Sequence, residues 1–218
     1  MQPGRAVLFV NGEMPSAPAM RAIIRPDDLI VAVDGGLKHV QALELTPHWI
    51  IGDLDSVAPD EMDHWQSSGV KIDRYPVEKD ETDLELALQS VVRSGYDTIL
   101  IAAATGGRLD HTLGNLNLLS DPRLQEFNVR LDDGQVEIFV IRTDAEINGA
   151  AGDIVSLMPL GAAVEGVLTT DLKFPLRRET LYPEKTRGIS NVMLGEHARV
   201  EITHGTLLCI HYRNQYLE

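Results

Sequence analysis

Residues 82–111 decide the fold, and they read TDLELALQSVVRSGYDTILIAAATGGRLDH. Thr82 and Glu85 have the spacing of a capping box at the start of a helix. The residues after them form one apolar stripe at helical spacing, made of Leu84, Ala87, Leu88, Val91 and Val92. Thr98–Ala104 is typical of a buried strand, and a second helix is predicted from Asp110 to Leu119. This order of elements predicts a mainly parallel sheet covered by helices.

The sequence before this stretch repeats the pattern of short apolar runs and helical segments. The predicted strands are Ala6–Val10, Leu29–Val33, His48–Ile51 and Val70–Arg74. Their apolar character is nearly continuous, as expected of parallel strands that are buried on both faces. We therefore predict an N-terminal α/β domain over residues 1–133.

The pattern changes near Asp132, after which helical periodicity nearly disappears and glycines become frequent. Short alternating strands predict an all-β sandwich over residues 134–218. We expect Thr206–Tyr212 to form a C-terminal hairpin with the strand around Val200. The polar segment 170–186 is predicted to be a loop.

Composition narrows the possible partners and compartment. The 218-residue chain has a formal net charge of −14, which opposes binding to nucleic acid or to anionic membrane surfaces. A single cysteine, Cys209, excludes an intrachain disulfide and a cysteine-rich metal site. The N-terminus has no signal-peptide pattern, and no apolar run is long enough to cross a bilayer. We expect a cytoplasmic protein.

Polar motifs follow the predicted strands of the first domain. They are Asp34-Gly35-Gly36, Gly52-Asp53-Leu54-Asp55-Ser56, Lys79-Asp80-Glu81-Thr82-Asp83 and Gly106-Gly107-Arg108-Leu109-Asp110-His111. Loops after parallel strands gather at one edge of the sheet, where ligands bind in open α/β folds. We expect these motifs to meet in one crevice.

The charges of these motifs predict a metal and a phosphate ligand. The carboxylates would repel one another without a cation, and Mg²⁺ is bound by one or two carboxylates together with substrate phosphates. Glycines let the backbone approach a phosphate closely. Lys79 and Arg108 would neutralise phosphate oxygens.

Each motif also has a purely structural interpretation. Asp34-Gly35-Gly36 is a common turn, and Asp53 and Asp55 could be a turn residue and a helix cap. Asp83 and Asp110 could serve only the ends of their helices. The sequence contains neither a G-x-x-x-x-G-K-[ST] loop nor a G-x-G-x-x-G fingerprint after its first strand.

Taken together, the motifs resemble those of the thiamine pyrophosphokinase family. The resemblance rests on the four motifs above, on Asn115, and on two stretches in the second domain, Gly188-Ile189-Ser190-Asn191 and Gly205-Thr206-Leu207-Leu208. It implies transfer of a pyrophosphoryl group from ATP to the hydroxyl of thiamine, with Mg²⁺ as cofactor. It also implies a homodimer whose active sites lie where one subunit's α/β domain faces the other's sandwich.

The resemblance assigns a role to each candidate residue. Asp53, Asp55 and Asp80 are implied to be catalytic, and together with Asp83 to hold the metal. The implied ATP and phosphate contacts are Asp34, Gly35, Gly36, Lys79, Gly107, Arg108 and Asn115. The residues implied to bind thiamine are Asp83, Asp110, Ser190 and Asn191.

The chain departs from the family pattern in two places. Leu54 stands between the two aspartates where many members have Phe, which is a change of packing. Both tryptophans, Trp49 and Trp65, are N-terminal, whereas some members place a Trp near the C-terminal hairpin to stack on thiamine. The packing of the thiamine rings is left open. Two other functions stay open as well: a pyrophosphokinase for another hydroxymethyl heterocycle such as a pterin, and a non-catalytic sensor of thiamine or nucleotide.

Overall fold

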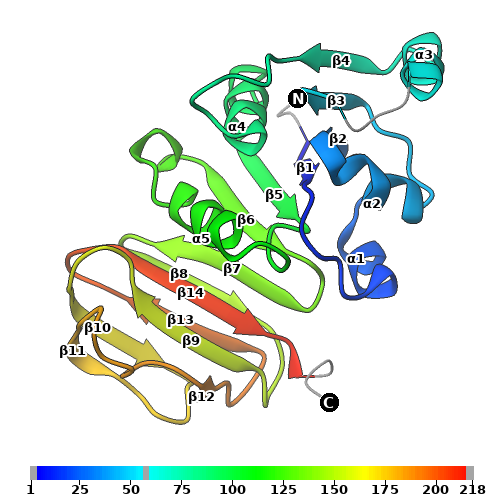
Figure 1. Cartoon of the computed structure of the whole chain (residues 1–218). Coiled ribbons are helices and arrows are strands. Elements are labelled where there is room, and N and C mark those ends of the chain that lie inside the picture. Colours follow the sequence, from blue (N-terminus) through cyan, green and yellow to red (C-terminus); the bar gives the residue numbers. More distant parts are fainter. Residues whose placement is uncertain (1–3, 56–58, 215–218) are drawn as a thin grey trace. The chain divides into compact units, whose positions relative to one another are not determined.

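The computed structural model describes residues 4–55 and 59–214. The chain divides into two compact units, residues 1–134 and 135–218. The first contains parallel strands and helices, and the second contains antiparallel strands (Figure 1).

The first unit is a parallel sheet with the strand order β6-β5-β1-β2-β3-β4. Its strands are β1 (Ala6–Phe9), β2 (Leu29–Val33), β3 (Trp49–Gly52), β4 (Lys71–Arg74), β5 (Thr98–Ala102) and β6 (Asn128–Asp132). Its helices are α1 (Ala17–Ile23), η1 (Asp34–Gly36), α2 (Leu37–Ala42), α3 (Pro59–Ser67), α4 (Asp83–Arg93), α5 (Leu109–Leu118) and η2 (Pro122–Leu124). The chain adds strands on one side of β1 and later on the other, which creates a switch point between β1 and β5.

Helices cover both faces of this sheet, as predicted. On one face, Val7, Phe9 and Ile50 pack with Met20 of α1 and Val40 of α2. Side chains alternate along a strand, so the neighbouring strand residues point to the opposite face. There α4 contacts β2 and β3, and Figure 1 shows α4 and α2 on opposite sides of the sheet.

The predicted N-cap of α4 is confirmed, but the Glu85 carboxylate pairs with Arg123, which is not the capping-box partner. Thr82 is the N-cap, and its hydroxyl accepts a hydrogen bond from the Glu85 backbone N–H at 3.3 Å. Glu85 forms an ion pair with Arg123. The apolar stripe of α4 is buried except for Val92, which is partly exposed, and α4 ends at Arg93, two residues before Gly95.

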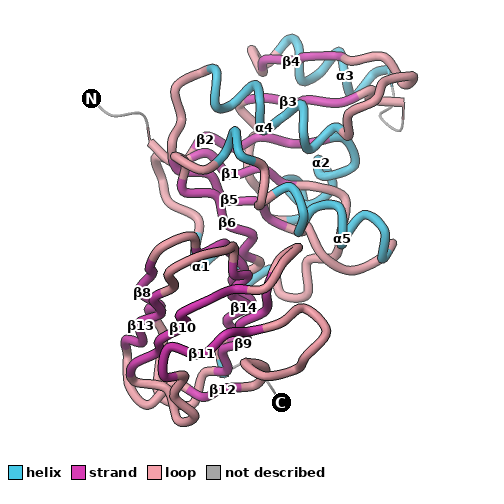
Figure 2. Tube along the Cα trace, turned by 90° about the vertical axis from the view of Figure 1, so that its left-hand side faces the viewer, coloured by secondary structure: helices cyan, strands magenta, loops and turns pink. Residues whose placement is uncertain are grey.

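The second unit is a sandwich of two antiparallel sheets, visible as separate layers in Figure 2. One sheet has the order β12-β9-β14-β7, and the other has the order β11-β10-β13-β8. The strands are β7 (Val136–Ile141), β8 (Asp144–Asn148), β9 (Ile154–Pro159), β10 (Val164–Thr170), β11 (Arg177–Leu181), β12 (Asn191–Val192), β13 (His197–Glu201) and β14 (Leu207–Tyr212). Between the sheets lies a core that includes Val155, Val167 and Leu207.

Two predictions for this unit are wrong. β13 and β14 do not form a hairpin, because β13 pairs with β8 and β10 while β14 pairs with β7 and β9. Both strands bury one face in the same core, so the chain turns from one sheet to the other at Gly205, whose φ is +103°. The segment 170–186 is not only a loop, since it contains β11. That strand has a polar sequence because it is an edge strand with most of its side chains exposed.

Candidate active site

A pocket of about 510 Å³ lies in the first unit at the carboxyl ends of β1, β2 and β5. This is the switch point of the sheet, the usual place for a ligand in this architecture. The predicted residues that line it are Asp34, Asp83, Gly107, Arg108 and Asn115. Seven other predicted residues of this unit do not line it: Gly35, Gly36, Asp53, Asp55, Lys79, Asp80 and Asp110.

The loop after β1 forms one wall that sequence reasoning missed. Gly12 N–H donates to the Ala103 carbonyl at 2.8 Å, and Glu13 N–H donates to the Thr105 carbonyl at 2.8 Å. The Glu13 carboxylate also accepts from the Gly107 N–H at 3.0 Å. These bonds hold the loops after β1 and β5 together. The available signal was the Asn11-Gly12 pair directly after an apolar run.

Asp34 begins a 3₁₀ turn at the end of β2 and has a φ of +47°. The turn packs tightly on β1, since a Cβ at Gly36 would lie 1.9 Å from the Phe9 carbonyl oxygen. A Cβ at Gly35 would lie 2.6 Å from the Asn11 side chain. Gly36 is therefore required by packing against the main chain of β1, whereas a side chain at Gly35 would only displace the Asn11 side chain.

Asp53 and Asp55 are placed by the residue between them. Leu54 is 3% exposed, packs in the sheet core and has a φ of +59°. The Asp53 carboxylate accepts from the Asp55 N–H at 3.2 Å, which closes a tight turn. Leu54 thus anchors the loop while its neighbours carry the carboxylates, and the Phe-to-Leu departure leaves this arrangement intact. Ser56 lies outside the described residues.

Asp34, Asp53 and Asp55 form one carboxylate group. Oxygen atoms from the three side chains lie within 4.8 Å of one another, close enough to share a metal ion. Asp34 comes from the end of β2, and the two others follow β3. The structure therefore places Asp34, predicted as a nucleotide contact, with two of the predicted metal ligands.

The environment of Asp34 favours a bound cation. Burial raises the pKa of the Asp34 carboxyl, and the nearby charges of Asp53, Asp83 and Asp55 raise it further, against a backbone hydrogen bond that lowers it. Its Oδ1 is buried and has no hydrogen-bond partner among the described residues. A buried carboxylate oxygen without a partner, beside other carboxylates, is costly unless a cation balances it.

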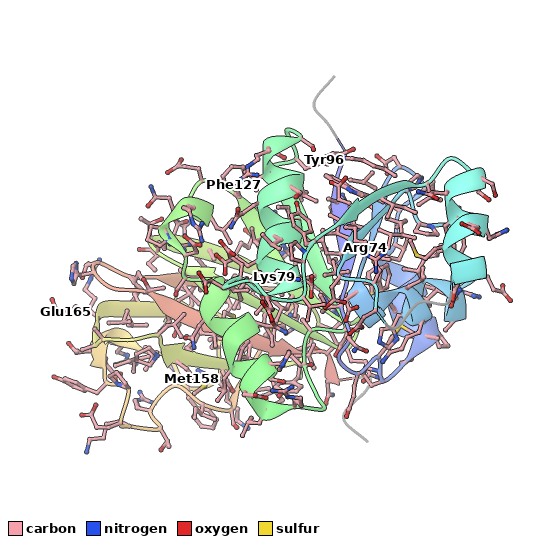
Figure 3. All side chains as sticks on the ribbon, turned by 45° about the horizontal axis from the view of Figure 1, so that its top comes forward. Arg74, Lys79, Tyr96, Phe127, Met158 and Glu165 are labelled. Atoms are coloured by element: carbon pink, nitrogen blue, oxygen red, sulfur yellow. The ribbon has the colours of Figure 1, made fainter. Side chains whose placement is uncertain are left out.

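Lys79, Asp80 and Asp83 occupy the approach to α4. The Lys79 ammonium donates to Asp83 at 2.8 Å and to the Pro76 carbonyl at 3.0 Å, and Figure 3 labels Lys79 near the start of that helix. Asp83 lines the pocket, whereas Asp80 is exposed and is not part of the carboxylate group. Lys79, the predicted phosphate-binding cation, is therefore paired with Asp83, one of the predicted metal ligands.

Arg108 and Asp110 form a second pair of this kind. Arg108 donates through Nε at 3.1 Å and through a terminal nitrogen at 2.6 Å to the two Asp110 oxygens. The hydrogen bond from Arg108 lowers the pKa of Asp110 to about 2. Asp110 lies in the first turn of α5, after the N-cap residue Arg108, and its Oδ1 also accepts from the His111 N–H at 3.0 Å. Asn115, one turn further on, donates to the Ala104 carbonyl at 2.8 Å and so fixes the loop after β5.

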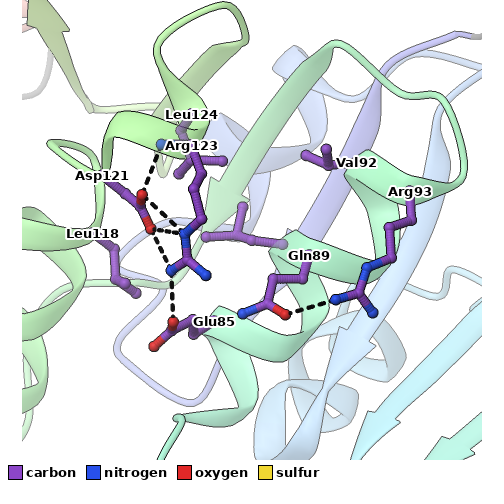
Figure 4. Close-up of a pocket in the computed structure, with 9 residues that line it drawn as sticks. Glu85, Gln89, Val92, Arg93, Leu118, Asp121, Arg123 and Leu124 are labelled. Atoms are coloured by element: carbon purple, nitrogen blue, oxygen red, sulfur yellow. Dashed lines mark hydrogen bonds and ion pairs between the residues drawn. The ribbon is translucent and has the colours of Figure 1, made fainter.

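A smaller cavity of about 200 Å³ lies between α4 and the segment around η2 (Figure 4). Its lining is mainly apolar, with Leu88 and Val92 among its residues. Arg123 at its rim is paired with Asp121 at 2.6 Å and with Glu85 at 2.8 Å. No predicted site residue lines it.

The two predicted site residues of the second unit differ in exposure. Ser190 is exposed, has a φ of +59°, and its N–H donates to the Ser156 hydroxyl at 3.0 Å. Asn191 is 4% exposed. Its side-chain amide bonds the main chain of Phe174, with Nδ2 donating to the carbonyl at 2.8 Å.

Comparisons with known proteins agree across both units. Residues 20–131 match the family described as thiamin pyrophosphokinase, catalytic domain, and residues 139–207 match thiamin pyrophosphokinase, vitamin B1 binding domain. The chain is 29% identical over 185 residues to the thiamine pyrophosphokinase of Bacillus subtilis, covering 84% of this chain and 86% of that protein.

Solved structures show the same fold. The crystal structure of thiamine pyrophosphokinase from Bacillus subtilis has a TM-score of 0.85 and 25% identity, covering 96% of this chain and 99% of that one. A thiamin pyrophosphokinase family protein from Enterococcus faecalis has a TM-score of 0.82 and 27% identity, with coverage of 96% and 99%. None of the helices in the described part of the chain is long and apolar enough to span a membrane. With matches to both of its domains, in chain order, the chain belongs to the thiamine pyrophosphokinase family.

Proposed function

We propose that this protein transfers a pyrophosphoryl group from ATP to the hydroxyl of thiamine, giving thiamine diphosphate and AMP. The proposal is carried by the buried Oδ1 of Asp34, which has no hydrogen-bond partner within residues 4–55 and 59–214 and belongs to a carboxylate group at the edge of the pocket. A site with this charge is suited to a metal–phosphate substrate. The family match supplies the identity of the acceptor, because it includes a vitamin B1 binding domain.

The residues present fit a magnesium ion. Asp34, Asp53 and Asp55 would hold it, since hard oxygen ligands are those Mg²⁺ prefers. When bound, the ion would draw charge from the phosphate oxygens during transfer. Asp80 and Asp83, the other predicted ligands, stay proposed participants on the α4 side of the site, and Asp83 must first release Lys79.

The chain's cationic groups would take over as the nucleotide binds. Arg108 is paired with Asp110 and Lys79 with Asp83, so each cation is held near the pocket without a ligand. Phosphate oxygens can replace those carboxylates, and the guanidinium can bind two of them at once. Gly107 lines the pocket wall, where its N–H is bound by Glu13, and Gly35 stays a proposed nucleotide contact. Gly36 lets the turn pack against β1, and Asn115 holds the loop after β5.

At the β-phosphorus of ATP, the proposed reaction forms one bond to oxygen and breaks another. The thiamine hydroxyl oxygen attacks the β-phosphorus of ATP, and the bond from that phosphorus to the oxygen bridging the α- and β-phosphates breaks. AMP leaves with that oxygen, and the hydroxyl proton passes to a carboxylate among Asp53, Asp55 and Asp80. The protein contributes mainly alignment of the hydroxyl with the phosphorus and stabilisation of charge.

We also propose how the protein binds thiamine and how two subunits assemble. Asp83 and Asp110 would face thiamine from the first unit, and the loop with Ser190 and Asn191 would face it from the second. We propose a homodimer in which these parts come from different subunits. Two leucines one turn apart on α5 support a partner surface, because Leu109 is 71% exposed and Leu113 is 51% exposed.

A substrate panel tests the proposed acceptor. Purified protein with ATP and Mg²⁺ is given thiamine or a hydroxymethyl pterin, and AMP release is measured. We expect AMP only with thiamine and no release after chelation of the metal. AMP release with the pterin and none with thiamine would mean that the acceptor is another hydroxymethyl heterocycle. Thiamine binding without AMP release would make the protein a sensor and contradict the proposal.

A further inference from the structure

The loop before β12 is bound to β9 at two points, one on each side of Ser156. On one side, the Leu157 N–H donates to the Gly188 carbonyl at 2.9 Å. On the other side, Val155 is paired with Asn191, the first residue of β12. Between these points β9 has one residue and the loop has two. Two residues opposite one is the arrangement of a β-bulge, which often turns a side chain toward a functional site.

The two loop residues of this bulge are Ile189 and Ser190, and both are exposed. Ser190 has a φ of +59°, a left-handed conformation that residues other than glycine adopt only with support from their surroundings. The Ser190 hydroxyl makes no hydrogen bond within residues 4–55 and 59–214, so it is available to a ligand. The bulge lies within residues 139–207, the part that matches a vitamin B1 binding domain.

Support for the left-handed residue comes from the side chain of Ser156. Its hydroxyl oxygen accepts a hydrogen bond from the Ser190 N–H at 3.0 Å, and so takes the place of a main-chain acceptor where the strand pairing is interrupted. Ser156 is 7% exposed, so little of its own surface can meet a ligand. An alanine at position 156 would remove this bond and leave the backbone of Ser190 free to relax.

We infer that Ser156 is a positioning residue for thiamine, whose hydroxyl fixes the conformation in which Ser190 presents its own hydroxyl to the substrate. The inference rests on the proposed function, in which Ser190 contacts thiamine. A binding group that is already held in its bound conformation loses less conformational entropy when the ligand arrives. Ser156 therefore strengthens thiamine binding without touching thiamine, and it has no part in binding ATP.

A double-mutant cycle between Ser156 and Ser190 tests this role. The variants are Ser156→Ala, Ser190→Ala and the double variant, with kcat and the KM values for thiamine and ATP measured by AMP release. We expect Ser156→Ala to raise the thiamine KM about five- to tenfold and to leave kcat and the ATP KM unchanged. In the Ser190→Ala background it should have no further effect. Ser156→Thr keeps the hydroxyl and should restore the thiamine KM.

Ser90 provides the matched control for the loss of a buried hydroxyl. It is 8% exposed, lies on α4, and its hydroxyl donates to the Leu86 carbonyl at 2.8 Å. Ser90→Ala should lower the stability in urea about as much as Ser156→Ala does, but it should leave the thiamine KM unchanged. Thiamine binding to the intact protein, measured calorimetrically without ATP, is independent of turnover and should weaken about five- to tenfold in Ser156→Ala alone.

Failure of this inference differs from failure of the proposed function. A wild-type protein that releases no AMP from ATP and thiamine overturns the proposed function. An active wild-type protein whose Ser156→Ala variant keeps the wild-type thiamine KM and affinity overturns the inference alone. If the effects of Ser156→Ala and Ser190→Ala on the thiamine KM multiply, Ser156 acts independently of Ser190 and its positioning role is wrong. An equal rise of both KM values in Ser156→Ala would also contradict that role.

Discussion

Asp34 has both a structural position in a tight turn and a proposed role in binding the metal ion. It follows β2 and begins a tight turn in the left-handed region. Its buried carboxylate oxygen, which has no partner in the described part of the chain, lies beside Asp53 and Asp55. Residues held in such conformations are maintained by their surroundings and are common at functional sites. Here the surroundings are the close contact of Gly36 with β1.

Replacing Asp34 by Asn should separate activity from stability. Because the pKa of Asp34 is raised above 3.8, its ionised form is disfavoured in the folded protein. This cost is complete above the raised pKa, decreases as pH falls through it, and is absent below the unfolded pKa of 3.8. Without metal at pH 7, Asp34→Asn should therefore be as stable as wild type or more stable by about 1 kcal/mol or less, measured by urea unfolding. Its activity with Mg²⁺ should fall about a hundredfold or more.

Asp53→Asn is the companion variant and should lose activity to a similar extent. A marked loss of stability in Asp34→Asn combined with wild-type turnover would mean that Asp34 serves the turn alone. Full activity in Asp53→Asn would remove that aspartate from the metal site.

Gly36 gives a test of the packing that supports this residue. A Cβ at that position would lie 1.9 Å from the Phe9 carbonyl oxygen, so Gly36→Ala must displace the turn or the strand. The expected cost is about 1–3 kcal/mol in the free energy of unfolding. The matched control is Gly114 in α5, where a Cβ would have no atom within 4 Å and alanine should stabilise by about 1 kcal/mol or less. Equal effects of the two substitutions would disprove the close contact.

The sequence predicted the positions of the carboxylate loops, but it did not predict the side-chain contacts that hold the loops in place. Asp53 and Asp55 follow an apolar strand, and their position can be inferred from the order of residues in the sequence alone. Glu13, which holds Gly107, and the pairing of Lys79 with Asp83 depend on side chains meeting in space. The sequence carries no periodic signal for such contacts.

At the scale of elements, a buried charge cluster joins β14 to β7 and to Asp153, the residue before β9, in addition to the backbone pairing of these strands. His211 on β14 is fully buried and binds the Asp153 carboxylate at 2.8 Å through Nε2, while Glu137 of β7 lies 3.8 Å from Nδ1. Burial lowers the pKa of His211, but the two carboxylates outweigh burial and raise it above 6.5. Burial raises the pKa of Asp153, and hydrogen bonds from Asn214, His211 and Ala150 bring it below 3.8.

These shifts predict a window of pH in which the cluster stabilises the sandwich. The contribution of His211 is complete below its unfolded pKa of 6.5 and is lost as pH rises through its folded pKa. The contribution of Asp153 is complete above 3.8 and is lost as pH falls through its lower folded pKa. His211→Gln should therefore be less stable than wild type by about 1–3 kcal/mol between pH 4 and 6.5, with a smaller difference at pH 9.

Thermal or urea unfolding of wild type and His211→Gln across pH measures this difference. A difference that grows from pH 6 to pH 9 would contradict a charged His211. Arg199→Gln on β13, whose exposed ion pairs with Asp144 and Glu201 are weak, is the control and should shift stability only slightly at any pH.

Elements with strong periodicity were predictable, and polar or short ones were not. The stripe of α4 and the apolar run of β5 gave nearly correct bounds. β11 was missed because an edge strand can be polar on both faces. The assumed hairpin of β13 and β14 was wrong because alternation shows that a strand has a buried face without showing which sheet it joins.

At the scale of the whole molecule, the net negative charge of the protein has opposite effects on the two proposed substrates. The net charge of −14 attracts cationic thiamine and repels ATP until local cations and the metal offset it. Raising ionic strength at constant free Mg²⁺ should therefore raise the thiamine KM and lower the ATP KM, each by a few-fold. Steady-state kinetics at low and high salt test this, and a shift of both constants in the same direction would argue against long-range attraction of thiamine.

The identity of the products tests the central claim most directly. Purified protein is incubated with thiamine, ATP and Mg²⁺, and the products are identified by mass spectrometry, with Asp53→Asn measured in parallel. Transfer of a pyrophosphoryl group predicts thiamine diphosphate and AMP in equal amounts, and almost none from the variant. Thiamine monophosphate with ADP, or no phosphorylated thiamine from the wild-type protein, would contradict it.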